Sequence, residues 1–289
     1  MLVIKMCPAH QKMKICILER RQPYARPSTS ENLQRTCTAV TDYTQRMETD
    51  KTLWLGLQRP TIWIKIRQFL YKAMHETQKI GHFWTHIQGY KERQDCPTCR
   101  TTETMEHILT TCQETPVRAI WKLAKEHWPQ ENPQWPEITL GIILGCGGIM
   151  SISQPQHPND EQQGRRTEGG AVRLLQILLT ESAHLIWVLW CERVIQQRHH
   201  TENEIQTRWL NNINKRLTKD KITATKIKRT KSMINKVRAT WEGVLSMTGF
   251  LPNNWMHQQE FLVGRRAWGP GLMRDPNPEP HTYPIPGCA

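Results

Sequence analysis

Four potential metal ligands lie close together in this chain, at Cys96, Cys99, His107 and Cys112. They follow the spacing C-x2-C-x7-H-x4-C. Thiolates and an imidazole at such short intervals are the ligands that a tetrahedral Zn2+ ion takes from one loop and an adjoining helical turn. Because a bound metal would tie four points of the chain together, this spacing constrains the local fold more strongly than any other feature of the sequence.

The residues between the ligands favour convergence on one ion. Cys-Pro-Thr-Cys can form a tight knuckle that aims both sulfurs at one point, with Pro97 restricting the backbone. The segment Glu103–Cys112 has few helix breakers, so we expect His107 and Cys112 on one short helix, facing the same ion. The alternative, four unrelated residues, is disfavoured by the paired spacing. A site filled by four protein ligands is structural, since a catalytic zinc keeps a position for water.

Cysteine usage and hydropathy indicate the environment of the protein. Nine cysteines are an odd number, several of them belong to the metal-type cluster, and no apolar signal stretch follows the amino terminus. These features favour a reducing, intracellular setting. The segment Ala171–Cys191 is the most apolar, but Arg173, Gln176, Glu181 and His184 interrupt it at helical spacing. We therefore expect a buried helix there and no membrane span.

The charge of the chain indicates a polyanionic partner. A net charge of +13 and a pI near 9.5 favour nucleic acid. The segment Lys215–Arg238 contains ten Lys or Arg residues and the single acid Asp220. This basic stripe indicates phosphate contacts, although a solvated helix face or a nuclear-import signal has the same composition. The candidate contacts in it are Lys226, Lys228, Arg229 and Lys231.

Further candidates for nucleic-acid contacts lie beside the cysteines. Lys91, Arg93 and Arg100 border the Cys96–Cys99 pair and could contact phosphates while zinc fixes their direction. Most of the twelve tryptophans lie on apolar helix stripes and are expected to pack in the core. Trp84 and Trp54, flanked by polar loop residues, are the better candidates for stacking on an exposed base.

No catalytic residues are expected. Glu181 and His184 form the Glu-x-x-His pattern of di-iron bundles, but those sites need a second copy and two further glutamates. A polar notch in an apolar helix is the simpler interpretation. No Cys-His-Asp grouping suggests a nucleophile, and Cys146 and Cys191 are expected to be buried thiols.

Apolar periodicity predicts a mainly α fold, an irregular helical array with one zinc knuckle between two helices and a C-terminal three-helix portion. The expected helices span residues 62–80, 117–128, 172–196, 205–217 and 233–245. We divide the chain into a partly disordered connector (1–50), a helical zinc-binding module (51–128), a Pro/Gly/Gln-rich linker (129–170), a basic helical region (171–250) and an irregular Pro/Gly-rich tail (251–289). Within the connector we expect a helix from Glu31, and within the linker an extended apolar piece at 138–149.

The segment KTLWLGLQRPTIWIKIRQFLYKAMHETQKIGHFWTHIQGYKERQDCPTCRTTETMEHILTTCQ resembles the reverse-transcriptase zinc-binding domain at the carboxyl end of fungal non-long-terminal-repeat retrotransposon polyproteins. The resemblance continues through AIWKLAKEHW, WPEITLGIILGC, LLQILLTESAHLIWVLWCERVI, RWLNNINKRL and LPNNWMHQQEFLVGRRA, and covers about Ser28 to Trp268. It implies structural zinc on Cys96, Cys99, His107 and Cys112.

In that family the module follows reverse transcriptase and RNase H-like domains, whose chemistry needs carboxylates that converge on Mg2+. Residues 1–50 offer only scattered acids without an alternating strand pattern, and no polymerase Asp-Asp pair occurs in the chain. These acids are Glu19, Glu31, Asp42, Glu48 and Asp50. We therefore expect a fragment that lacks the catalytic domains of the family and is not an enzyme.

The expected function is binding of RNA or DNA, in the nucleus rather than the cytoplasm, with no membrane and no small-molecule substrate; the oligomeric state stays open. One alternative is a structural or protein-interaction remnant whose zinc only holds a fold. Another is a fragment of an RNase H or reverse transcriptase that acts only with its missing domains. Removing zinc, or changing Cys99 to Ala, is expected to loosen Thr52–Trp128 and to spare the later helices.

Overall fold

The computed structural model describes residues 26–152, 161–227, 230–246 and 251–264, with side chains from residue 169 onward in the second segment. Within these residues the regular structure is helical, and the extended pairing consists of one antiparallel bridge between Asp95 and Thr102. The prediction of a mainly α fold is therefore confirmed.

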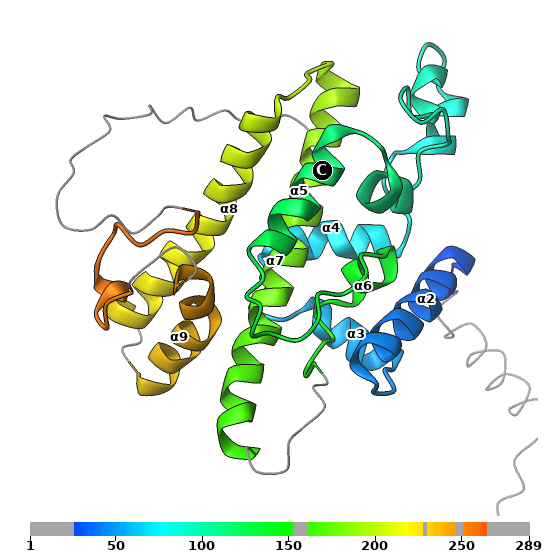
Figure 1. The fold of residues 1–289 in the computed structure, drawn as a ribbon. Coiled ribbons are helices and arrows are strands. Elements are labelled where there is room, and N and C mark those ends of the chain that lie inside the picture. Colours follow the sequence, from blue (N-terminus) through cyan, green and yellow to red (C-terminus); the bar gives the residue numbers. More distant parts are fainter. Residues whose placement is uncertain (1–25, 153–160, 228–229, 247–250, 265–289) are drawn as a thin grey trace, which may run out of the picture.

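The α-helices are α2 (Pro27–Thr44), α3 (Asp50–Leu57), α4 (Ile64–Met74), α5 (Thr115–Glu126), α6 (Leu140–Gly145), α7 (Glu161–Gln196), α8 (Glu202–Ile222) and α9 (Lys231–Ser246). The described residues also form the short 3-10 helices η1 (Gly81–His86), η2 (Lys91–Gln94) and η5 (Trp255–His257), and the π-helical turns η3 (His107–Thr111) and η4 (Thr223–Ile227). Figure 1 shows α7 in the centre, with α8 and α9 on one side and α2, α3 and α6 on the other.

Local sequence signals explain several helix ends. Thr201 caps α8 together with Glu204, each side chain bonding the backbone N–H of the other. α5 begins with a proline in its first turn, where the missing N–H costs nothing. α4 ends at Met74 and is capped by His75, because Glu76 adopts a left-handed conformation with φ 49°. The expected helix 62–80 is therefore too long, and Ile80 lies outside it.

Helix α7 is the core of the fold. It begins at Glu161, so part of the expected linker 129–170 belongs to this helix. It is long and apolar enough to cross a membrane, but 83% of its apolar window is buried inside the protein. The polar residues that interrupt it have partners, since Arg173 pairs with Asp220 of α8 and Gln176 donates to the carbonyl of Ile149. The prediction of a buried helix is confirmed.

The apolar piece of the expected linker is a helix rather than an extended segment. Thr139 accepts a hydrogen bond from the N–H of Ile142 and begins α6, whose residues are all buried. α6 packs on α2 so closely that a methyl group at Gly145 would overlap Val40. Its glycines therefore serve packing, as the sequence suggested. The same contact makes α2 an integral part of the fold rather than a connector, while residues 1–25 lie outside the described residues.

The described part of the tail lies against the three-helix portion. Asn214 of α8 donates to the carbonyl of Val263 and accepts from its N–H. Trp255 is buried and donates to Glu242 of α9. Most of this segment is irregular, as predicted, yet it contributes to the core. Residues 265–289 lie outside the described residues.

Candidate metal centre

The four predicted ligands converge. One ligand atom from each of Cys96, Cys99, His107 and Cys112 lies within 4.8 Å of the others. The sulfur of Cys112 is 3.8 Å from that of Cys96 and 3.9 Å from that of Cys99. Zinc–sulfur bonds of about 2.3 Å in a tetrahedron place the sulfurs about 3.8 Å apart. The cluster can therefore hold a metal ion without rearrangement of its thiols.

A tight turn positions the first two sulfurs. The N–H of Arg100 donates to the carbonyl of Cys96 at 2.8 Å, and the N–H of Cys96 donates to the carbonyl of Thr101 at 2.8 Å. Arg100 has φ 56°, the left-handed conformation that reverses the chain. The N–H of Gln113 donates to the sulfur of Cys99 at 3.3 Å.

The other two ligands lie at the two ends of η3, since His107 is its first residue and Cys112 follows its last. The π-helical form of η3 differs from the α-helical geometry that was expected. On an α-helix, residues five apart are rotated by about 500°, so His107 and Cys112 would diverge by about 140°. In the structure the N–H of Cys112 donates to the carbonyl of His107 at 2.9 Å. This i to i+5 bond places the two residues roughly one π-helical turn apart. Both side chains consequently face the same point.

The imidazole of His107 is oriented for coordination. Its Nδ1 lies 3.3 Å from the hydroxyl of Thr111. Its Nε2 is buried and has no hydrogen-bond partner among the described residues, with the Oε2 atom of Glu103 at 3.9 Å. Buried polar atoms normally have partners. A metal bond at Nε2, with Thr111 holding the opposite ring nitrogen, would meet this requirement.

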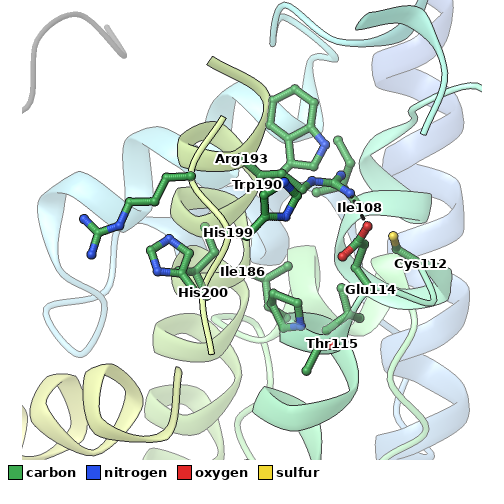
Figure 2. A pocket seen from close by; sticks show the side chains of 13 residues that line it. Ile108, Cys112, Glu114, Thr115, Ile186, Trp190, Arg193, His199 and His200 are labelled. Carbon is green, nitrogen blue, oxygen red and sulfur yellow. Dashed lines mark hydrogen bonds and ion pairs between the residues drawn. The ribbon is translucent and has the colours of Figure 1, made fainter. Parts of the chain in front are cut away.

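Contacts from α7 surround the cluster, and sequence reasoning missed them. Arg193 lies 2.7 Å from Glu114, 3.2 Å from Glu103 and 4.0 Å from the sulfur of Cys96. Trp190 donates to Glu103 at 2.9 Å. Figure 2 shows the Arg193–Glu114 pair beside Cys112. No local spacing relates these residues, because α7 follows the knuckle at long range in the sequence.

The charge at the cluster depends on the ionisation of its thiols and on the nearby guanidinium of Arg193. Burial raises the pKa of the Cys112 thiol, so a metal ion would have to displace its proton. Three thiolates with a divalent ion leave one net negative charge. Burial disfavours the charged form of Arg193, but Glu114, the hydrogen bond to Cys96 and Glu103 together outweigh it and raise the pKa of Arg193. The guanidinium therefore stays charged next to Cys96.

The predicted nucleic-acid contacts beside the knuckle lie on η1, η2 and the turn. Lys91 and Arg100 are exposed. The guanidinium of Arg93 covers Trp84 at 5.1 Å and Tyr90 at 4.5 Å from the ring centroids. Trp84 is half-buried, so its ring is less open to a base than expected. Phe83, 40% exposed, and Tyr90, 42% exposed, offer more open rings, and the sequence analysis did not select them.

The segment 215–238 does not form a continuous basic stripe. Arg216 and Lys221 are buried, and Lys221 lies 3.4 Å from the carbonyl of Phe261. Lys226 and Lys231 are exposed, as expected of phosphate contacts. Lys228 and Arg229 lie outside the described residues. The helical period divides the charges of this segment between the solvent and the core, which composition cannot show.

Glu181 is buried and His184 is half-buried, so neither is a fully solvated residue. Glu181 is 5% exposed, and its carboxylate lies 3.6 Å from Arg216. Burial raises the pKa of Glu181 to about 7, against the opposing effects of Arg216 and Lys65. Burial lowers the pKa of His184 to about 4, and its ring packs edge-on against Phe69. The described residues supply no second Glu-x-x-His copy opposite them, in line with a packing role.

The raised pKa of Glu181 makes stability depend on pH. The folded protein binds this proton more tightly than the unfolded chain, whose glutamate has the ordinary value of 4.5. Its contribution is complete below pH 4.5 and is lost as pH rises through about 7. The unfolding free energy of Glu181→Gln minus that of wild type should therefore increase by on the order of 3 kcal/mol from pH 4.5 to pH 8. Urea unfolding of both proteins at the two pH values measures this, and a constant difference would contradict it.

Comparisons of the chain with protein-family models, with curated proteins and with solved structures find no match. The interpretation of the centre therefore rests on its ligands and their geometry. Those are three sulfurs and one imidazole, brought together by a reversed turn and a π-helical turn and supported by Arg193.

Proposed function

We propose that this chain is a zinc-stabilised helical module that binds RNA or DNA. The observation that supports this best is the position of exposed basic and aromatic residues directly beside a Cys3His cluster. Soft sulfur ligands with one imidazole, at tetrahedral separations, favour Zn2+ over harder cations. Four protein ligands leave no position for water, so the zinc would stabilise structure rather than catalyse a reaction.

The metal would fix the direction of the neighbouring basic residues. η2, which contains Lys91 and Arg93, leads directly into the knuckle. The N–H of Glu103 donates to the carbonyl of Gln94 at 2.9 Å, and Asp95 pairs with Thr102. These bonds tie both sides of the cysteine turn together. A metal that orders the cysteine turn would therefore also order Lys91 and Arg93, the side chains proposed to contact phosphates.

The aromatic residues on η1 and η2 suit unpaired bases. Phe83 and Tyr90 are exposed, and Lys79 lies 5.7 Å from the ring of Phe83. Exposed rings next to cations are the usual combination for holding single strands, where the rings stack on bases and the cations follow the backbone. We refer to Phe83, Trp84, Tyr90, Lys91 and Arg93 as the aromatic-basic lobe.

We further propose that the module derives from a non-long-terminal-repeat retrotransposon polyprotein, works in the nucleus and has no catalytic domain of its own. The motifs around Cys96–Cys112 and the later helical segments support this origin through their resemblance to that family. A structural or protein-interaction remnant is the alternative. A fragment that acts only with missing RNase H or reverse transcriptase domains would show Mg2+-dependent cleavage of an RNA/DNA hybrid once those domains are supplied.

Removing the exposed rings tests the function. We expect Phe83→Ala/Tyr90→Ala to weaken binding of a single-stranded oligonucleotide about tenfold or more, because each stacked base contributes about 1–3 kcal/mol. Fluorescence anisotropy over a salt series measures this. Tyr71→Ala on α4, where the ring is 55% exposed, is the matched control. No binding at low ionic strength, or affinity that does not fall with salt, would exclude the nucleic-acid function.

A further inference from the structure

Trp63, the residue before α4, is surrounded by cations from two distant parts of the chain. The charged group of Lys65 lies 5.7 Å from the ring centroid, that of Arg216 lies 5.2 Å away and that of Lys219 lies 5.0 Å away. Arg216 also donates to the carbonyl of Thr61. We call Trp63, Lys65, Arg216 and Lys219 the Trp63 cluster.

The positive charge of this cluster is only partly compensated. Arg216 is 4% exposed, and Glu181 is the carboxylate 3.6 Å from it. Asp220, the neighbouring acid, already pairs with Arg173 and accepts from Trp241. Lys65 and Lys219 are exposed and form no salt bridge within the described part of the chain. The cluster therefore concentrates positive charge at the surface.

Such an arrangement favours an anionic partner. Like charges repel, and a surface usually relieves this repulsion with nearby carboxylates. Here the indole face attracts the cations and holds them together, since cation–π contacts are worth about 0.5–1 kcal/mol at exposed sites. An anion placed between Lys65 and Lys219 would remove the repulsion and would not have to displace a bound carboxylate from either side chain.

We propose that the Trp63 cluster is a contact site for the phosphodiester backbone of a nucleic-acid strand. This inference rests on the proposed function and adds a second contact to the aromatic-basic lobe. Trp63 directly precedes α4, and the lobe begins at Phe83, after α4 and the loop that follows it. The contact reads no sequence, because phosphates are the same at every position.

The test removes the two exposed cations and leaves buried Arg216 in place. We expect Lys65→Gln/Lys219→Gln to bind single-stranded RNA and DNA oligonucleotides about tenfold or more weakly at low salt, with a salt slope smaller by about 1.4. The matched control is Lys122→Gln/Lys125→Gln on α5, which removes the same charge from another exposed surface. Far-UV circular dichroism and metal content check that both variants are folded.

The outcomes separate this site from the proposed function. A larger loss in the Trp63-cluster variant than in the α5 variant supports the site. Equal losses in the two variants, with salt-dependent binding by the wild type, would overturn the site and leave the proposed function standing. Absence of binding by the wild type at low salt would overturn both.

Discussion

Cys112→Ser should release the metal and unfold the region around it. The binding energy of structural zinc, about 10–16 kcal/mol in small zinc-binding peptides at neutral pH, acts as folding energy. We therefore expect loss of stoichiometric metal and of amide-exchange protection from η2 to α5. The last turn of α7 should also lose protection, because Arg193 contacts Glu103, Glu114 and Cys96. This extends the effect beyond the range 52–128 that the sequence suggested.

Metal analysis combined with hydrogen exchange measures both effects. Cys37→Ser on α2 is the control, since Cys37 lies outside the cluster and should leave metal content unchanged. Zinc in the wild type, at one ion per chain, supports the assignment of the metal. Full metal content in Cys112→Ser would contradict the centre, and unchanged protection in α7 would contradict the coupling through Arg193.

Asp220→Ala should cost about 3–5 kcal/mol of unfolding free energy, the range for removing one partner of a buried ion pair. Asp220 is 7% exposed and lies 2.7 Å from Arg173. It also accepts the indole N–H of Trp241 at 2.8 Å. One carboxylate thus joins α7, α8 and α9. Its removal leaves a buried guanidinium without its counter-charge and an indole N–H without its acceptor.

Urea unfolding of three further variants sharpens this prediction. Asp42→Ala, at an exposed acid on α2, should change stability by no more than about 0.5 kcal/mol. Arg173→Met/Asp220→Leu should be more stable than Asp220→Ala, because it leaves no unpaired charge. Asp220→Asn should lie between Asp220→Ala and wild type. A loss below about 1 kcal/mol in Asp220→Ala would show that the pair is solvated.

Local signals determined much of the fold. Apolar residues at three- and four-residue steps predicted α5, α8 and α9, and these helices begin and end close to the expected positions. Helical periodicity is a property of neighbouring residues, so it can be recognised without knowledge of the tertiary structure. The candidate metal ligands could also be predicted from the sequence, because all four belong to one short segment whose spacing suits coordination of a single ion.

Other features depended on contacts between distant residues. Because α2 packs closely on α6, segments that were expected to be a connector and a linker contribute to the core. The buried ion pair of Asp220 removed an apparent surface charge, and the Trp63 cluster gathered cations from α8 and the start of α4.

The sequence by itself determined which residues can bind the metal and where most helices form, since both depend on short-range spacing. Only the structure showed that a π-helical bond, rather than the expected α-helical geometry, turns His107 and Cys112 toward the same point, and that Arg193 of α7 lies against the cluster. It also decided which charges are buried and which reach the solvent. These outcomes depend on the packing of α7 against its neighbours, and burial and charge pairing across such contacts leave no regular pattern along the chain.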